Sequence, residues 1–482
     1  MKRRYATALY LAIPLALVAC ADSGDLHTTG QLTDPQSLKV ERSLAGAPLS
    51  PTAWPQQDWW SAFGDPQLTS LINEALKTNP HLDEVEARAR QAQAAANGKN
   101  AAREPHVDLG AGMEGARLSS RDPLYPAYDL GAWGWAEEVS LNFSWDLDLW
   151  GGKRDAWEAA LGRSRAAQID AYAARIQLSV NVARAYVSLG YAFDLKDVTD
   201  AELQRADKSL GLIHRLVAGG LEAPQQEYLA DSQLASARQQ QAQAERAIDA
   251  ARSSLSVLLG QGPDRGLLIT RPHLQDLGTL ALPEQLPAGL LGRRADLVAA
   301  RWQIEAAAKD IKSAKTEFLP NISLGAMVGL IALGGSNPST IHLFEAPART
   351  YSVGPALTLP IFDGGRLHAN LAAADSGYDQ LVARYNGLLV HAINDVADDL
   401  SALTSIRNQI ALEKSAQQDA RKSWEDAIKA YKSGLSGPLA PLISRQQLLL
   451  TEQRLAALES QQADISVRLI EALGGGYDVA KN

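Results

Sequence analysis

Three glycines in the first quarter of the chain have the spacing of a nucleotide-binding loop. Gly110, Gly112 and Gly115 fit the pattern GxGxxG, whose glycines let a tight turn approach a pyrophosphate. That fingerprint requires a helix directly after the glycines and an acidic residue about 20 positions later. Here residues 117–126 contain two prolines and have the composition of a loop. The pattern therefore argues against a nucleotide site.

Two aspartates, Asp146 and Asp148, have the spacing of a pair of catalytic carboxylates. They alternate with Leu147 and Leu149, however, and period-two alternation is typical of a strand with one polar face. This pattern favours the lining of a lumen, or contact with interfacial water, over catalysis. The eight histidines lack the spacing of metal ligands. We therefore predict no metal site, no cofactor and no enzymatic activity.

The single cysteine, Cys20, follows a sequence typical of bacterial export. Residues 2–4 are basic and precede an apolar run over about 6–19, which is too short for a spanning helix. The tetrad Leu-Val-Ala-Cys that ends at Cys20 resembles a lipobox, which implies a signal peptide over 1–19 and a covalent lipid on Cys20. Ala21 resembles the residue that follows the cysteine in lipoproteins sent to the outer membrane. The alternative is an ordinary signal peptide with an incidental cysteine.

The composition excludes two other classes of protein. A net charge of −9 and a pI near 5.5 remove the basic face on which nucleic-acid binding depends. No run of 18 or more apolar residues follows the N-terminal segment, so the sequence predicts no internal transmembrane helix. Aromatic residues make up only 6% of the chain, and this low share suits long, closely packed helices.

The sequence contains an internal repeat, in which matching residues lie about 214 positions apart. The matching positions, with their offsets, are Pro105 and Pro320 (320 − 105 = 215), Gly151 and Gly364 (364 − 151 = 213), and Gly260 and Gly474 (474 − 260 = 214). A repeat of this length indicates a duplicated supersecondary unit, here with both copies wound into one body. We expect a lipidated tether at 20–57, repeat 1 at 58–272 and repeat 2 at 273–482.

Four segments alternate apolar and polar residues with the period of a strand. In the clearest of them, Leu141 and Phe143 alternate with Ser140 and Asn142. The four expected strands are about 105–117, 138–150, 320–332 and 351–362. Each is close to the roughly 9–11 residues that a tilted strand needs to cross a bilayer. The ordinary alternative is a soluble sandwich with one wet face.

Very long helices are expected after each pair of strands. Long stretches without proline predict helical hairpins at about 153–260 and 366–473, and antiparallel hairpins of this length bury their apolar stripes as coiled coils. Glycine pairs precede both hairpins, at Gly151, Gly152, Gly364 and Gly365. Such pairs could cradle a phosphate, but between a strand and a helix they usually supply the positive φ of a sharp turn. Beside these turns we expect lipid headgroups to be contacted by Lys153, Arg154 and Arg366.

These elements predict a mixed α and β membrane protein with an internal tandem duplication. Strands in hydrocarbon must close into a barrel, and four strands per chain cannot do so alone. Three chains supply twelve strands and leave a water-filled lumen. We predict a homotrimeric 12-stranded transmembrane β-barrel, continued by a long α-helical coiled-coil barrel in the periplasm.

The chain resembles the outer membrane factor family, the TolC-like and OprM-like channels, over about residues 58–478. The motifs that carry the resemblance are Trp59-Trp60 with Phe63 and Asp65-Pro66, Asn79-Pro80, Trp145 to Gly152, Arg293 to Leu297, Leu319 to Leu324 and Pro360 to Arg366. The resemblance implies a lipid-anchored outer-membrane exit duct for drugs or small toxic compounds. It also implies two partners, a periplasmic adaptor and an inner-membrane efflux pump. The alternatives are a lipid-anchored coiled-coil scaffold without a pore, and a type I secretion duct.

The resemblance places candidate sites at the hairpin tips. Gly220-Leu221 and Gly434-Leu435 match the positions at which family members present a glycine and an apolar residue to the adaptor; a simple turn without a partner is the alternative. A periplasmic constriction or selectivity site is expected nearby, at Glu222, Glu227, Asp231, Leu439, Leu442, Ile443 and Arg445. The family's acidic positions beyond the second tip are apolar or serine here, which favours an apolar constriction. The three acidic residues form cation-favouring rings or lie on a solvated face.

Overall fold

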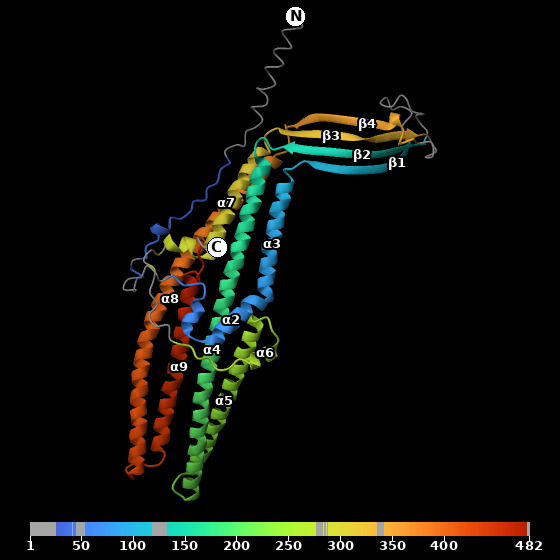
Figure 1. The fold of residues 1–482 in the computed structure, drawn as a ribbon. Helices are drawn as coiled ribbons and strands as arrows, with labels where there is room; N and C mark the ends of the chain where they lie inside the picture. The colour runs from blue at the N-terminus through green and yellow to red at the C-terminus, as the bar shows by residue number, and fades with distance from the viewer. Residues whose placement is uncertain are drawn as a thin grey trace. The chain divides into compact units, whose positions relative to one another are not determined.

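The computed structural model describes residues 26–40, 42–44, 54–117, 133–275, 283, 286, 288–334 and 342–479 (Figure 1). The expected signal peptide at 1–19 and the expected lipid site Cys20 lie outside the described residues. The chain divides into two compact units. The first unit is Met1–Gln31, Ala89–Ala166 and Arg301–Ala383, and the second is Leu32–Arg88, Ala167–Ala300 and Arg384–Asn482. Each unit therefore takes segments from both sequence repeats.

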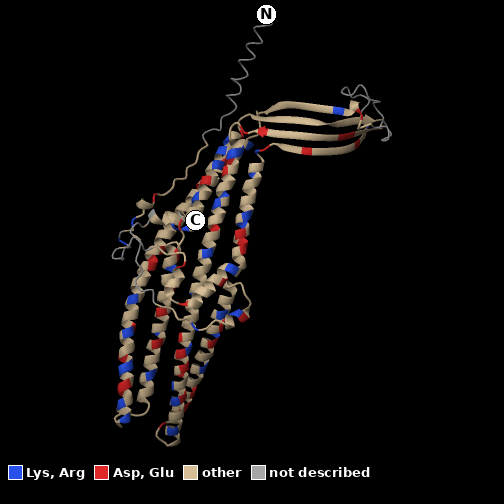
Figure 2. Ribbon diagram, in the orientation of Figure 1, with Lys and Arg blue, Asp and Glu red and all other residues tan. Residues whose placement is uncertain are grey.

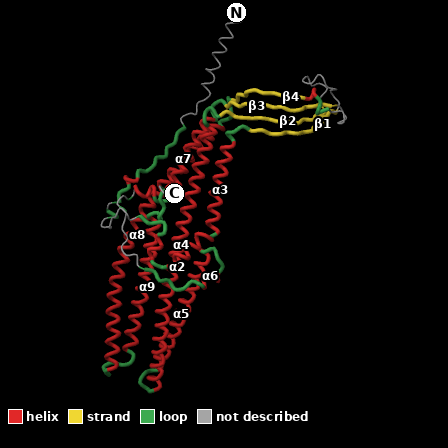
Figure 3. Tube along the Cα trace, in the orientation of Figure 1, coloured by secondary structure: helices red, strands yellow, loops and turns green. Residues whose placement is uncertain are grey.

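A four-stranded antiparallel sheet belongs to the first unit (Figure 3). Its strands, in the order β1-β2-β3-β4, are β1 (His106–Arg117), β2 (Trp133–Leu147), β3 (Asn321–Gly334) and β4 (Arg349–Thr358). Two strands differ from the expected bounds, because β2 lies earlier than 138–150 and β4 earlier than 351–362. The chain leaves β2 at Asp148, whose side chain caps the next helix, and it leaves β4 before Pro360, which lacks the N–H of a strand ladder.

Long helices make up most of the remaining chain. They are α2 (Pro66–Thr78), α3 (Pro80–Ala101), α4 (Gly152–Ala218), α5 (Pro224–Leu258), α7 (Ala295–Thr316), α8 (Arg366–Lys432) and α9 (Ala440–Ala472), with the short α6 (Pro263–Leu267). Helices α4 and α8 hold 67 residues each, or about 100 Å at 1.5 Å per residue. Among the described residues, none of the helices has the length and apolar content needed to cross a membrane.

The strand-to-helix turns before α4 and α8 have the same construction. Asp148 accepts hydrogen bonds from the N–H groups of Lys153 and Arg154, and Asp363 accepts them from Gly365 and Leu367. These carboxylates satisfy free helix N–H groups that a phosphate would otherwise use. Asp148 lies after the end of β2 and caps α4, and its expected contact with a lumen or with interfacial water stays a prediction.

Three of the four turn glycines adopt a positive φ, and the fourth has another role. The φ angles are +76° at Gly151, +67° at Gly364 and +90° at Gly365. Gly152 is the first residue of α4, and a Cβ there would lie 2.0 Å from the Thr316 hydroxyl oxygen. Gly152 therefore permits close approach of α7, and the expectation of a positive φ at this position was wrong.

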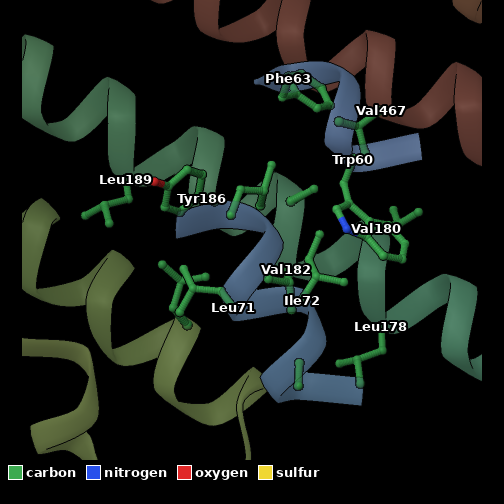
Figure 4. Packing of buried hydrophobic residues seen from close by; sticks show 14 of the residues in the cluster. Trp60, Phe63, Leu71, Ile72, Leu178, Val180, Val182, Tyr186, Leu189 and Val467 are labelled. Atoms are coloured by element: carbon green, nitrogen blue, oxygen red, sulfur yellow. The ribbon is translucent and has the colours of Figure 1, made fainter. Parts of the chain in front are cut away.

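The core of the second unit surrounds helix α2 (Figure 4). Side chains of the 3₁₀ helix Trp59–Phe63, of α2 and of α4 meet there in one buried cluster. Tyr186 is fully buried and donates a hydrogen bond of 2.8 Å to Asp65. The same carboxylate caps α2 by accepting from the N–H groups of Gln67 and Leu68. The Trp-Trp and Asp-Pro motifs therefore form structural contacts.

Glycine at position 329 is predicted to be required for pairing of β2 with β3. A Cβ at Gly329 would lie 2.5 Å from the Val139 carbonyl oxygen and 2.8 Å from the Ser140 Cα. Because backbone atoms must shift, Gly329→Ala should lower the stability of the sheet by about 1–3 kcal/mol. Gly325, on the same face of the same strand, has open space at its Cβ, so Gly325→Ala is the control. Thermal unfolding followed by circular dichroism in detergent checks this, and equal midpoints for the two variants would contradict it.

Candidate functional site

One face of the sheet is apolar and exposed. The strand register aligns Leu109, Leu141, Val328 and Tyr351 in a single row across all four strands. Their exposed fractions are 71%, 46%, 57% and 83%. The same face carries further exposed apolar side chains: Val107, Val353 and Leu357. An apolar surface of this extent is rare on a soluble monomer and marks contact with a membrane or a partner.

The opposite face of the sheet carries mostly small and polar side chains, with Met327, Ile331 and Leu333 of β3 as apolar exceptions. One row across it is Gly110, Ser140, Gly329 and Thr350, and the next row includes Asp108, Asn142 and Ser352. The Ser140 hydroxyl donates to Glu138 at 2.7 Å, and the Asn142 amide donates to Ser140 at 3.0 Å. Gly110, Gly112 and Gly115 lie inside strand β1, in ladder pairing with β2. They do not form the strand-to-helix turn of a dinucleotide site.

Tryptophans mark both ends of the apolar face. Trp133 and Trp135 form an edge-to-face pair at one end, with ring centroids 6.0 Å apart. At the other end, the indole of Trp145 donates to the Arg103 carbonyl at 3.0 Å and that of Trp150 to the Pro320 carbonyl at 2.7 Å. Charged residues are few along the strands but frequent along the helices (Figure 2). These aromatic ends were not predicted from the sequence, although the positions of Trp133, Trp135 and Trp145 in β2 were the signal.

The sheet has open edges. Among the described residues, the order β1-β2-β3-β4 leaves one side of β1 and one side of β4 without a neighbouring strand. Unpaired strand edges beside an exposed apolar face are a template for pairing with another chain. The isolated chain is therefore incomplete as a membrane-embedded body.

The cations beside the strand-to-helix turns bind carboxylates of the protein. Lys153 lies 2.7 Å from Asp146, and Arg154 lies 2.8 Å from Glu158. Glu158 also bonds Lys309 at 2.5 Å, and Lys309 and then Arg154 lower the pKa of Glu158 to about 2. Asp146 was expected to line a lumen or meet water; it has a protein cation as partner and stays partly exposed, so that expectation stays a prediction. Contact of these cations with lipid headgroups stays a prediction.

Both hairpin tips in the second unit are built as the same capped turn. Gly220 and Gly434 have a φ of +72°, and the N–H groups of Leu221 and Leu435 each donate to a carbonyl five residues earlier at 2.8 Å. This is the Schellman motif, in which the residue after the glycine normally packs back on its helix. Here Leu221 is 76% exposed and Leu435 is 83% exposed. Each tip therefore presents a leucine to its surroundings.

The acidic residues expected near the first tip have different environments. Glu227 bonds His214 across the hairpin at 2.7 Å, and it is half-buried. Glu222 is half-buried and Asp231 is exposed. The His214 contact was not predicted from the sequence. The role of all three acidic residues in selectivity stays a prediction.

The apolar residues expected at the second tip lie at the start of α9. Leu439 and Leu442 are half-buried, and Ile443 is 65% exposed. Arg445 stacks on Trp424 of α8, with 4.8 Å between the guanidinium carbon and the ring centroid. Its Nη1 atom lies 3.4 Å from Glu452 Oε1. Arg445 therefore fastens α8 to α9, and its role in a constriction stays a prediction.

An acidic group inside the second unit was not predicted. Asp399 of α8 is buried, and its carboxylate lies 2.9 Å from Arg468 of α9. Burial raises the pKa of Asp399 to about 6 against the attraction of Arg468, and Asp398 and Asp395 raise it further. Burial also raises the pKa of Glu471. The pattern of apolar residues did not indicate this buried acidic group, because an aspartate is ordinarily placed on the solvent-exposed face of a helix.

The native protein is expected to lose free energy of unfolding as the pH rises from 4 to 7. Asp399→Asn is expected to make this loss smaller. The folded-state pKa of Asp399, about 6, lies above its ordinary value of 3.8. Its stabilising contribution is therefore full below pH 3.8 and is lost as the pH rises through 6. The difference is of the order of 1–3 kcal/mol. Denaturant unfolding at pH 4 and pH 7 measures it. Asp419→Asn, on an exposed position of α8 outside this acidic group, is the control, and an unchanged pH dependence in Asp399→Asn would contradict the assignment.

Among the described residues, no group of three or more histidine, cysteine, aspartate or glutamate side chains could hold a metal ion. The site is therefore made of surfaces: an apolar sheet face with aromatic ends, a polar sheet face, and two leucine-bearing tips. Such surfaces bind a bilayer, water and protein partners.

Known proteins match the chain over most of its length. The model of the family described as "Outer membrane efflux protein" matches twice, over residues 71–261 and 286–475. The fusaric acid resistance protein FusA of Burkholderia cepacia is 37% identical over 375 residues, covering 76% of this chain and 68% of that protein. The multidrug resistance outer membrane protein MdtP of Escherichia coli O6:H1 is 31% identical over 460 residues, covering 93% and 92%.

A solved structure has the same fold. The outer membrane protein VceC of Vibrio cholerae gives a TM-score of 0.78 at 33% identity, covering 88% of this chain and 100% of that chain. The resemblance drawn from the motifs is thereby confirmed, as is an outer-membrane location. Because the family model matches most of the chain, once in each sequence repeat, this chain belongs to the outer membrane efflux protein family.

Proposed function

We propose that three copies of this chain pair their sheet edges into one closed 12-stranded barrel in the outer membrane. The open edges of β1 and β4 support this proposal, because strands in hydrocarbon must satisfy all their backbone groups. Two copies would give eight strands, whose interior is filled by side chains, whereas three copies leave an aqueous lumen. The apolar face then meets lipid and the polar face lines the lumen.

The separation of the tryptophans supports a transmembrane position for the sheet. Trp135 and Trp145 are ten residues apart on β2, or about 33 Å along a strand at 3.3 Å per residue. A strand tilted by about 40° spans about 25 Å of that length along the membrane normal, which is the height of the apolar band in such barrels. This apolar face with aromatic ends is the observation that carries the proposal.

The helical hairpins continue this barrel as a coiled-coil duct in the periplasm. The exposed Leu221 and Leu435 at the tips meet a periplasmic adaptor, which joins the duct to an inner-membrane pump. Contact with the adaptor separates the tips, and the energy for transport comes from the pump. A lipid on Cys20 anchors each chain in the membrane. Neither a cofactor nor a reaction is part of this function.

The cargo proposed is a set of drugs or small toxic compounds. The relatives support this proposal, because their names refer to fusaric acid resistance and multidrug resistance. Deletion of the gene, followed by a toxicity screen with and without the restored protein, tests it. The proposal expects several-fold lower tolerance to a group of compounds. Unchanged tolerance together with loss of a secreted protein would indicate a type I secretion duct instead.

A conductance measurement distinguishes the proposed channel from the alternative of a scaffold without a pore. The purified protein reconstituted into a planar bilayer is expected to conduct ions once the periplasmic end is open. Because the resting periplasmic end can be closed, the measurement includes a variant in which Leu442 and Ile443, two residues of the expected apolar constriction, are serine. A complete absence of conductance in both proteins, at full membrane insertion, would favour the scaffold.

A further inference from the structure

A short N-terminal segment of the first unit lies along helix α8. We name Leu26–Gly30 the anchor strap. Leu26 packs against a buried cluster formed by Ile311, Phe318, Leu367 and Leu371. Burial alternates along the strap, because Leu26 and Gly30 are half-buried whereas the intervening His27 and Thr29 are exposed. The strap is therefore an extended segment with one face against the protein.

One carboxylate holds the far end of the anchor strap. Asp379 Oδ1 accepts from the Thr29 N–H at 3.0 Å and from the Gly30 N–H at 2.7 Å. Asp379 Oδ2 accepts from the Thr29 hydroxyl at 2.7 Å and lies 3.0 Å from the Thr29 nitrogen. A carboxylate that accepts several N–H and O–H donors is among the stronger neutral-donor arrangements. These donors also lower the pKa of Asp379.

Glycine at position 30 fits the same contact. A Cβ on Gly30 would lie 2.9 Å from Asp379 Oδ1 and 3.2 Å from the Asp379 Cα. It would also lie 3.1 Å from the Val382 Cβ, so any larger residue pushes the strap away from the helix. Thr29 supplies hydrogen-bond donors, and Gly30, which has no side chain, allows the backbone to approach Asp379 closely. The carboxylate and the strap are complementary in both chemistry and shape.

The spacing of these contacts fixes the direction of the strap. Leu371 and Asp379 are eight residues apart on α8, or about 12 Å. Leu26 and Gly30 are four residues apart, or about 13 Å in an extended chain. The strap therefore runs beside α8 in the same direction as the helix. In the second unit, the Thr33 N–H likewise donates to the Asn386 side chain at 2.9 Å.

We infer that Asp379 is a docking site for the anchor strap, and that the docked strap sets how far the lipid anchor can lie from the strand-to-helix turns. Leu26 packs against the cluster that contains Phe318 and Leu367, and these two residues flank the start of β3 and the Gly364-Gly365 turn. Cys20 is six residues before Leu26, a reach of at most about 20 Å. Docking thus limits the distance between the acyl attachment point and the docked Leu26 to this reach. This second half of the inference rests on the proposed lipid on Cys20.

Hydrogen exchange on the full-length protein in detergent tests the docking. The amides of Thr29 and Gly30 are expected to exchange slowly in the native protein and at least about ten-fold faster in Asp379→Ala. Gly30→Val leaves the carboxylate in place but blocks its approach, and it should give the same release. Gln380→Ala, on an exposed neighbouring position, is the control and should change neither amide. Peptides from the core of α4 report whether each variant is folded.

Two outcomes would overturn the inference. One is fast exchange of both amides in the native protein, and the other is unchanged exchange in a folded Asp379→Ala variant. Cys20→Ala separates docking from lipidation, because docking alone predicts protected Thr29 and Gly30 amides in this variant. If mass spectrometry finds no acyl chain on the N-terminal peptide of the native protein, the lipid proposal fails, and the docking site stands as long as Cys20→Ala keeps that protection.

Discussion

Leu141→Arg is expected to prevent stable assembly in the outer membrane, whereas Asn142→Arg is expected to be tolerated. Leu141 lies on the apolar face, midway between Trp135 and Trp145, and is 46% exposed in the chain. An arginine at the bilayer midplane of a barrel costs about 2–4 kcal/mol, and a trimer contains three of them. Asn142 is adjacent but points to the polar face, where its register partner on β1 is Asp108.

The two variants differ only in the face of the sheet that receives the charge. Membranes from cells that express each variant are extracted, and the assembled form is quantified on gels without heating. The account expects the native amount for Asn142→Arg and a large loss for Leu141→Arg. Equal amounts of the two variants would mean that this face does not meet hydrocarbon, and the soluble-sandwich alternative would then apply.

The double variant Leu221→Ser, Leu435→Ser is expected to abolish efflux-dependent resistance without loss of the assembled protein. Both leucines project from tips of identical construction. Burying a leucine contributes about 1.5–3 kcal/mol, so two per chain and six per trimer dominate a contact with the adaptor. Because the side chains are more than 75% exposed, their removal should leave the hairpins folded.

The control for the tip variants is Ser433→Ala, on the exposed turn beside Leu435. Minimum inhibitory concentrations are measured in a deletion strain that carries each variant, and the amount of assembled protein is measured in parallel. Normal resistance with the double variant would remove the tips from the proposed mechanism. The expected cargo compounds come from the deletion screen.

The periodic elements of the fold could be predicted from the sequence. Alternation around Leu141 predicted strand β2, and the glycine pairs predicted the turns before α4 and α8. These signals are local, because a strand or a sharp turn is specified within a few residues. The strand bounds were less accurate, since β2 begins five residues before the expected Glu138.

Contacts between distant segments could not be predicted in this way. The bond from Asp379 to Thr29 joins residues 350 positions apart, and no period or motif marks either partner. Gly152 resembled a turn glycine, but the reason for its presence is the side chain of Thr316. Asp399 is charged, so its burial beside Arg468 contradicts the ordinary preference of its residue type. Only the packed structure reveals such pairs.

Sheets from three chains are proposed to close one barrel. The number of chains in the purified particle is therefore the decisive observation. Native mass spectrometry of the protein, extracted from membranes in mild detergent, gives the number of copies in the intact particle. The account predicts three. A particle that holds one or two copies would contradict the 12-stranded barrel and the aqueous duct that depends on it.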